Sequence, residues 1–215
     1  MSLVAVIDYG MGNLRSVAKA LEHVDSKVNI KITNDAADIK AADHIVFPGQ
    51  GAIGAAMQAL KERDLDKILL EEMGKKPFLG ICLGLQVMMD ASEEDGGTSG
   101  LGLLPGQVKR FPSPHVDVDG TRLKVPHMGW NQLQQTQDHP VWKGIEQASR
   151  FYFVHSYYVT TDIKEEIAGT CDYGLEFVAA ASRDNMFAVQ FHPEKSAQAG
   201  LKLLQNFLSW DGQPV

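Results

Sequence analysis

The chain has 215 residues, of which 44% are hydrophobic, so it can bury one sizeable core. Its 27 acidic and 20 basic residues give a formal net charge of -7, which argues against nucleic acid or an anionic membrane as the main partner. Two cysteines make no disulfide framework, the opening MSLVAVIDYG lacks the features of a signal peptide, and no apolar run approaches the roughly 18 residues that cross a bilayer. We therefore expect one cytoplasmic domain over residues 1–215.

The first half of the chain alternates short apolar runs with helical patterns. The predicted strands are LVAVID (3–8), KVNIKIT (27–33), HIVFPG (44–49) and PFLGIC (77–82). The predicted helices cover residues 13–24, 53–72 and 83–91. This alternation is typical of βαβ units and a mostly parallel sheet.

The pattern changes in the second half. Glycine and proline punctuate residues 96–126, and the run FYFVHSYYVT follows at 151–160, so we expect loops and partly antiparallel strands there. A strand at MFAVQF (186–191) and an amphipathic helix from Ala197 to Trp210 complete the chain. The predicted fold class is therefore α/β: an open, mostly parallel twisted sheet flanked by helices, with some antiparallel edge strands.

The segment GQGAIG, from Gly49 to Gly54, follows a predicted strand and opens a helix. It matches G-x-G-x-x-G, a dinucleotide-binding fingerprint that also needs an acidic residue about 20 positions later at a strand end. The candidates Glu71 and Glu72 instead lie in a predicted helix. Such a turn also exposes backbone N–H groups that stabilise a phosphate or an oxyanion, or it simply permits close helix packing. All three interpretations stay open at this point.

Cys82 lies in GICLG, between an apolar run and a helix. The G-x-nucleophile-x-G form is that of a nucleophile elbow, a sharp strand-to-helix turn that exposes the central side chain. Side chains in place of Gly80 and Gly84 would collide across such a turn, and the dipole of a helix beginning near Leu83 favours the thiolate. We predict that Cys82 is a nucleophile rather than an inert buried cysteine, and that Cys171, which lacks this frame, is structural.

His192 and Glu194 follow a predicted strand in the segment AVQFHPEKS. Positions i and i+2 of an extended chain project to the same side, and Pro193 fixes the backbone between them. This segment and the elbow both leave the carboxyl ends of parallel strands, where such folds place their sites. We therefore predict that His192 is the base for Cys82 and that Glu194 orients it, although one histidine after a strand is commonly structural.

Taken together, PGQG, GICLGLQ and FHPE resemble the class I (triad) glutamine amidotransferases, which have a flavodoxin-like glutaminase fold. The resemblance implies that Cys82 attacks the side-chain amide of glutamine and forms a thioester, while His192 passes the proton to departing ammonia. It implies that backbone N–H groups hold the oxyanion at Gly49, Gln50, Gly51 and Leu83. It further implies a glutamine pocket lined by Gln86, Glu94, Ser156 and Tyr157, each of which is otherwise an ordinary polar or strand position. This chemistry requires no cofactor and no metal.

Further motifs narrow the resemblance within the family: DYGMGNLRSV, PHMGWN, FVHSYY and FHPEKS. They are similar to the branch whose members form a heterodimer with a (β/α)8-barrel cyclase and supply it with ammonia in histidine biosynthesis. The residues implied to face that partner are Asn13, Met128, Trp130 and Asn131. Trp130 could instead belong to the core. Ammonia must stay unprotonated to act as a nucleophile, so we expect a shielded passage across the rim that carries Cys82.

Other functions remain in competition with this one. The same chemistry could serve anthranilate, aminodeoxychorismate, GMP or pyridoxal phosphate synthesis. The chain could be a nucleotide-binding module that uses GQGAIG, or a thiol hydrolase or peptidase built on the same elbow. Residues 112–122 carry no motif that assigns them a role.

Overall fold

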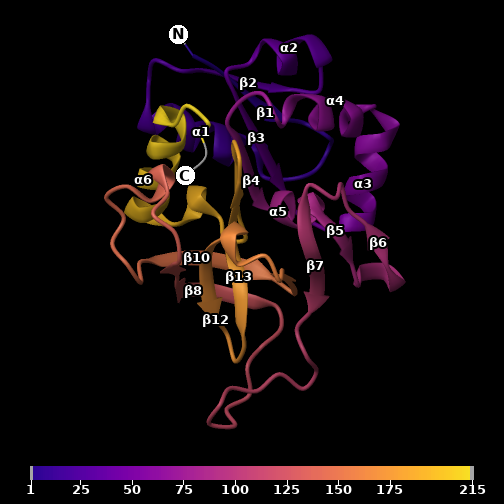
Figure 1. Cartoon of the computed structure of the whole chain (residues 1–215), viewed down its shortest axis with the longest axis vertical. Helices are drawn as coiled ribbons and strands as arrows, with labels where there is room; N and C mark the ends of the chain where they lie inside the picture. The colour runs from indigo at the N-terminus through magenta and orange to yellow at the C-terminus, as the bar shows by residue number, and fades with distance from the viewer. Residues whose placement is uncertain (1, 214–215) are drawn as a thin grey trace.

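Residues 2–213, which the computed structural model describes, form one large sheet of 12 strands and one small sheet of 2 strands with helices around them (Figure 1). One half of the large sheet is parallel, in the order β2-β1-β3-β4-β14. Its strands are β1 (Leu3–Ile7), β2 (Asn29–Thr33), β3 (His44–Gly49), β4 (Phe78–Cys82) and β14 (Met186–Val189).

The other half continues from β14 through β13, β11, β7, β5 and β6, and its pairs are antiparallel except for β5 with β7. These strands are β13 (Glu176–Arg183), β11 (Tyr157–Thr160), β7 (Leu104–Arg110), β5 (Met89–Ser92) and β6 (Thr98–Ser99). Beside β13 lie β12 (Ile167–Asp172) and, next to it, β9 (Gln134–Gln135). The small sheet pairs β8 (His127–Gln132) with β10 (Arg150–His155).

Helices cover both faces of the parallel half (Figure 1). They are α1 (Leu14–Val24), α2 (Ala36–Ala41), α3 (Ile53–Glu62), α4 (Leu65–Glu72), α5 (Leu83–Met88) and α6 (Ala197–Ser209). Short 3-10 turns are η1 (Glu94–Gly96), η2 (Pro140–Trp142), η3 (Lys164–Glu166) and η4 (Pro193–Lys195). No helix within residues 2–213 is both long and apolar enough to cross a membrane.

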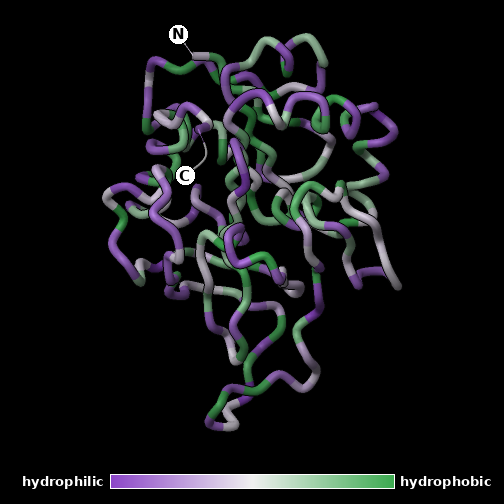
Figure 2. Tube along the Cα trace, in the orientation of Figure 1, coloured by the Kyte–Doolittle hydropathy of each residue, from purple (hydrophilic) through white to green (hydrophobic). Residues whose placement is uncertain are grey.

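Alternate residues of β1 point to opposite faces of the sheet, as the period of a strand requires. Val4 and Val6 belong to one buried cluster, with residues of α1 and α6. Ile7 belongs to the other cluster, with Phe47 of β3 and residues of α3, α4 and α5. Figure 2 shows hydrophobic residues along these central strands and on the helices beside them. Burial on both faces is the reason that β1, β3, β4 and β14 read as nearly continuous apolar runs, whereas the edge strand β2 is mostly exposed and alternates polar with apolar residues.

The predicted α/β class is confirmed, but several element boundaries differ from the prediction. The helix expected over 53–72 is two helices, because Asp64 takes a left-handed conformation with φ 53° between α3 and α4. The helix expected over 83–91 stops at Met88, and the chain continues as strand β5. Helix α2 was missed, although the Asp35 side chain caps it by accepting hydrogen bonds from the N–H groups of Ala37 and Asp38.

Candidate active site

Strand β4 ends at Cys82, which has the backbone angles φ 56° and ψ −106°, and α5 begins at the next residue. A positive φ at a non-glycine residue is strained, and here it turns the thiol away from the sheet as the elbow motif predicts. A Cβ atom on Gly84 would lie 2.1 Å from the carbonyl oxygen of Phe47, and one on Gly80 would lie 3.0 Å from Cβ of Ala188. The two glycines are thus needed chiefly because neighbouring strands approach them closely. The predicted collision between positions 80 and 84 across the turn is a weaker constraint, since a Cβ on Gly80 would lie 3.2 Å from the carbonyl carbon of Gly84.

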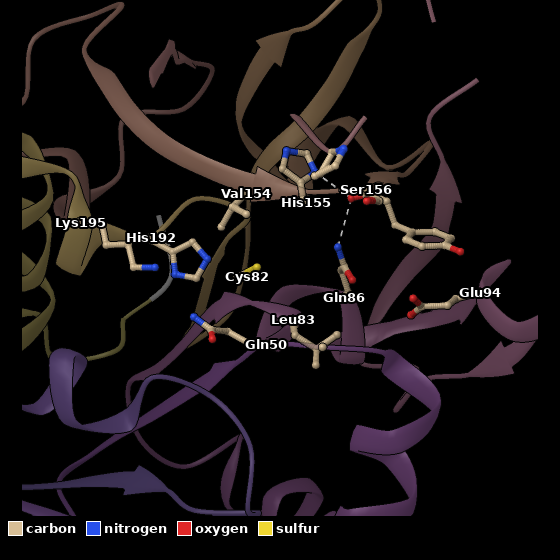
Figure 3. A pocket seen from close by; sticks show the side chains of 13 residues that line it. Gln50, Cys82, Leu83, Gln86, Glu94, Val154, His155, Ser156, His192 and Lys195 are labelled. Atoms are coloured by element: carbon tan, nitrogen blue, oxygen red, sulfur yellow. Dashed lines mark hydrogen bonds between the residues drawn. The ribbon is translucent and has the colours of Figure 1, made fainter. Parts of the chain in front are cut away.

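His192 and Glu194 lie just beyond β14, the strand that pairs with β4 in parallel. His192 Nδ1 is 2.9 Å from Glu194 Oε1, and both side chains are almost completely buried. His192 Nε2 makes no hydrogen bond to any residue that the structure describes. Because β4 and β14 end at the same edge, the His192 ring and the Cys82 thiol reach the wall of one cavity (Figure 3).

The surroundings of His192 change its affinity for a proton. Burial by itself lowers the pKa of an imidazole, but the nearby Cys82 thiol and the charged, hydrogen-bonded Glu194 carboxylate outweigh burial and raise the pKa of His192 to about 9. At neutral pH, therefore, the arrangement favours an imidazolium beside Cys82. This form can donate a proton to a leaving group, and Glu194 keeps the ring in place.

The turn Gly49–Gly51 lies against the elbow. A Cβ atom on Gly49 would be 2.4 Å from the Tyr9 hydroxyl and 2.8 Å from Leu83 Cβ, and Gly51 has φ +99°. The Tyr9 hydroxyl is buried and has no hydrogen-bond partner among residues 2–213, and burial raises its pKa. Only a residue without a side chain fits between Tyr9 and Leu83.

The first helical N–H beyond this turn already has an acceptor. Ile53 N donates to Glu94 Oε2 at 2.8 Å, so a carboxylate lies at the N-terminus of α3, where a dinucleotide phosphate would have to bind. The negative charge of Glu94 would repel a phosphate there. This contact removes the main structural support for the interpretation of GQGAIG as a dinucleotide fingerprint.

A cavity of about 440 Å³ opens at this edge of the sheet (Figure 3). Its walls come from the elbow, the Gly49–Gly51 turn, η1, the β10–β11 junction and η4. The lining residues are Gln50, Gly51, Cys82, Leu83, Gln86, Glu94, Pro126, Val154, His155, Ser156, Tyr157, His192 and Lys195. The structure therefore brings all four residues of the predicted glutamine pocket, Gln86, Glu94, Ser156 and Tyr157, into the same cavity as Cys82 and His192.

Several residues of this site were not assigned a role from the sequence. Lys195 stands directly after Glu194 in FHPEKS, and His155 lies inside FVHSYY, so both belong to motifs already noted. Gln190 is completely buried and places its amide Nε2 3.7 Å from Cys82 Sγ. Its position two residues before His192 was the available signal, since alternate residues of an extended segment share a side. Pro126 begins PHMGWN and Val154 lies inside FVHSYY, so these two also belong to motifs already noted.

Strand β8 carries most of the residues predicted to face a partner. Met128 is 62% exposed and Trp130 is 46% exposed, so Trp130 is not part of the core. Asn131 lies on the alternate side of the strand and donates a hydrogen bond to the Asp172 carbonyl oxygen at 2.8 Å. Asn13 precedes α1 and follows Gly12, which approaches Pro48 and Gly49, so it lies on the same edge as the elbow.

Cys171 lies in β12, almost completely buried. Burial raises the pKa of its thiol to about 12, which leaves it protonated and unreactive at neutral pH. Its environment is thus opposite to that expected of a nucleophile and agrees with the structural role predicted for it.

Comparisons with known proteins agree with this geometry. The family model described as glutamine amidotransferase class-I matches residues 5–210. The chain is similar to imidazole glycerol phosphate synthase subunit HisH of Nitrosomonas europaea, with 54% identity over 98% of this chain and 99% of the relative. The same subunit of Aromatoleum aromaticum is 56% identical, again over 98% of this chain and 99% of the relative.

Solved structures show the same fold at much lower sequence identity. A putative GMP synthase subunit from Thermoplasma acidophilum superposes with a TM-score of 0.70 and 18% identity, over 97% of this chain and 93% of that one. PurLQS from Thermotoga maritima gives a TM-score of 0.68 at 18% identity, over 97% of this chain and 98% of that one.

The fold, the elbow and the extent of the family match make this chain a member of the class-I glutamine amidotransferases. Within that family it belongs with the HisH subunits of imidazole glycerol phosphate synthase, since relatives of that kind are more than half identical to it over nearly its whole length.

Proposed function

We propose that this chain is the glutaminase subunit of an imidazole glycerol phosphate synthase and acts through a Cys82 thioester. The observation that carries the proposal is the strained Cys82 elbow beside the buried His192–Glu194 pair, in one cavity of a chain from this family. Cys82 Sγ attacks the side-chain carbonyl carbon of glutamine, the C–N bond breaks, and the His192 imidazolium gives its proton to the departing ammonia. Neutral His192 then takes a proton from water, which attacks the thioester and releases glutamate and the thiolate.

The developing oxyanion would be held by backbone N–H groups of the Gly49–Gly51 turn and of Leu83. Gln86, Glu94, Ser156 and Tyr157 would contact the substrate glutamine, because they line the cavity that contains Cys82. The carboxylate of Glu94 suits the α-ammonium group of an amino acid, although part of its hydrogen-bonding capacity is already used by Ile53 N.

The ammonia acceptor would be a separate (β/α)8-barrel cyclase that forms a heterodimer with this chain, in the cytoplasm and in histidine biosynthesis. The relatives' description as subunits of one synthase supports this choice over other acceptors. Pro126 lines both the glutamine cavity and a second cavity of about 580 Å³ that reaches the exposed Met128. Ammonia released at Cys82 would therefore leave beside the face that carries Met128 and Trp130.

The test of this proposal is loss of the nucleophile. Cys82→Ala should abolish glutamate release in the complex with the cyclase, while Cys171→Ala, which removes the other thiol, should leave it nearly unchanged. Added ammonium salt at alkaline pH should restore cyclase output in the Cys82 variant, because only the ammonia supply was lost. Substantial glutamate release by Cys82→Ala would refute the assignment.

A further inference from the structure

Three hydrogen bonds lead from the half-buried Asn131 of β8, through two buried histidines, to the wall of the glutamine cavity. Asn131 Nδ2 lies 3.3 Å from His127 Nε2. His127 Nδ1 lies 2.9 Å from His155 Nε2, and His155 Nδ1 lies 2.7 Å from the carbonyl oxygen of Tyr157. His127 and His155 are 3% and 6% exposed, so water does not replace these bonds readily.

The same Tyr157 carbonyl is approached from the side of the nucleophile. Gln86 Nε2 donates to Tyr157 O at 3.2 Å and to Gln190 Oε1 at 3.0 Å, and Gln190 Nε2 lies 3.7 Å from Cys82 Sγ. The dashed lines of Figure 3 mark the bonds that Gln86 and His155 make to this oxygen. A continuous series of contacts therefore joins β8 to Cys82.

The carbonyl oxygen fixes the orientation of every group on the β8 side, because it can only accept. His155 must carry its proton on Nδ1, which leaves Nε2 as an acceptor for a proton on Nδ1 of His127. His127 Nε2 is then an acceptor for the amide N–H of Asn131. Both rings must be neutral for this order to hold, and burial lowers the pKa of His155 to about 3 and that of His127 to about 4.

The orientation of Gln86 follows in the same way on the other side. Its two amide hydrogens are committed to Tyr157 O and Gln190 Oε1, so its own oxygen is the atom left for the cavity. Gln190, whose oxygen accepts from Gln86, necessarily presents an N–H to Cys82 Sγ. A ligand in the cavity thus meets an acceptor at Gln86, and the sulfur meets a donor at Gln190.

We infer that His127, on the strand predicted to face the partner, and His155, on the neighbouring strand β10, are positioning residues that fix the glutamine pocket. The inference rests on the proposed function, since it assigns the cavity to glutamine. Neither histidine takes part in the chemistry of the thioester. Their effect is to hold Tyr157 O, and through it the amide of Gln86, in the one orientation that accepts an N–H of the substrate.

The sharpest test replaces His127, which does not line the glutamine cavity. His127→Phe keeps an aromatic ring but removes both nitrogens, whereas His127→Asn keeps an amide N–H near the place of Nδ1. His115→Phe is the matched control: His115 is also buried, packs on the same Phe111 ring and bonds to the Tyr173 carbonyl, but lies outside the series. Each is assayed as the complex with its cyclase.

Loss of one oriented hydrogen bond to substrate should raise the KM for glutamine about fivefold or more in His127→Phe, with a smaller change in kcat. His127→Asn should recover most of the loss, and His115→Phe should stay near the wild-type KM. An unchanged KM in folded His127→Phe, or an equal rise in His115→Phe, would overturn the inference. If Cys82→Ala is inactive but the His127 variants keep the wild-type KM for glutamine, this inference is rejected and the proposed function still stands.

A second measurement needs no variant and no activity. Nitrogen-15 NMR of the imidazoles in the unsubstituted chain at neutral pH should show both His127 and His155 as neutral rings protonated on Nδ1. A ring protonated on Nε2 at either position would break the order of donors and acceptors and would overturn the inference, even if His127→Phe failed to fold.

Discussion

At the scale of single residues, the contact between His192 and Glu194 helps to determine how tightly His192 holds a proton. The folded pKa of His192 is about 9 against an ordinary value of 6.5, so the folded state binds this proton more tightly than the unfolded state does. The stability that results is complete below about pH 6.5 and is lost as the pH rises through about 9. The second carboxylate oxygen, Glu194 Oε2, has no hydrogen-bond partner among the residues that the structure describes.

Glu194→Gln should therefore lower the pKa of His192 and weaken, but not abolish, glutamine hydrolysis. His192→Ala removes the proton carrier itself and should be as damaging as loss of Cys82, whereas Glu194→Gln impairs only the orientation and charge of the ring. The pKa is followed by NMR titration of the imidazole, and activity by glutamate release. If Glu194→Gln hydrolyses glutamine at the full rate with His192 still titrating near the wild-type value, Glu194 is not the orienting residue.

The sequence could predict that Cys82 and His192 meet at one edge of the sheet, because both stand in short motifs whose geometry is local. Gly80 and Gly84 mark the turn that gives Cys82 its positive φ, and Pro193 fixes the backbone between His192 and Glu194. Gln190 could not be assigned in this way. Its spacing from His192 indicates only a shared side of the segment, and its contact with Cys82 depends in addition on β14 becoming the neighbour of β4 in the sheet.

At the scale of elements, the elbow depends on how closely α5 approaches β3. A Cβ atom on Gly84 would lie only 2.1 Å from the carbonyl oxygen of Phe47. This oxygen belongs to the backbone of β3, so it cannot move aside as a flexible side chain can. A Cβ on Gly80 would lie 3.0 Å from Cβ of Ala188, 3.1 Å from Sδ of Met88 and 3.2 Å from the carbonyl carbon of Gly84, so each neighbour has to yield by only a few tenths of an ångström. The two glycines of the motif are therefore unequal.

Gly84→Ala should lower the free energy of unfolding by about 3 kcal/mol or more, because a rigid strand and a helix must separate. Gly80→Ala should cost about 1 to 2 kcal/mol, since its neighbours stand farther from the added methyl group and the Met88 side chain can move aside. Urea unfolding followed by circular dichroism measures both. Equal losses for the two variants, or a smaller loss for Gly84→Ala, would contradict the packing described for the elbow.

The elements that sequence patterns predicted best were the buried parallel strands, which apolar runs identify without reference to the rest of the fold. The positions at which helices end were harder to predict from the sequence. Residues 53–72 keep a helical apolar period across Asp64, so the left-handed turn there is invisible in the pattern. Residues 89–91 pair with β7 and β6, and such tertiary pairing overrides a continuing helical pattern.

At the scale of the whole molecule, we propose that the Gly49–Gly51 turn connects catalysis to partner binding. Its glycines allow the peptide plane to reorient at little steric cost, so an N–H can be aimed at the oxyanion or away from it. One missing oxyanion donor costs about 3 kcal/mol, or about a hundredfold or more in rate. Asn13 and the exposed face of β8 lie on the side where a cyclase would bind.

We expect the isolated chain to be a poor glutaminase that becomes fully active only with the cyclase and its ligand bound. Steady-state glutamate release should rise by about a hundredfold from the isolated chain to the liganded complex, with the unliganded complex between them. Equal turnover in all three preparations would exclude gating by the turn. The assignment of Cys82, His192 and Glu194 would be unaffected by that result.

The alternation of side chains along β8 has a consequence for engineering and for evolution. Met128 and Trp130 point outward, whereas His127 and Asn131 point inward and take part in the hydrogen bonds that lead to Tyr157. A designer who wants an orthogonal synthase, one that ignores the cyclases already present in a host cell, can therefore vary the outward positions as a separate set. On the proposed function, natural lineages have the same freedom: the outward positions, every second residue of the strand, can change with the partner while the inward residues keep the hydrogen bonds behind the cavity.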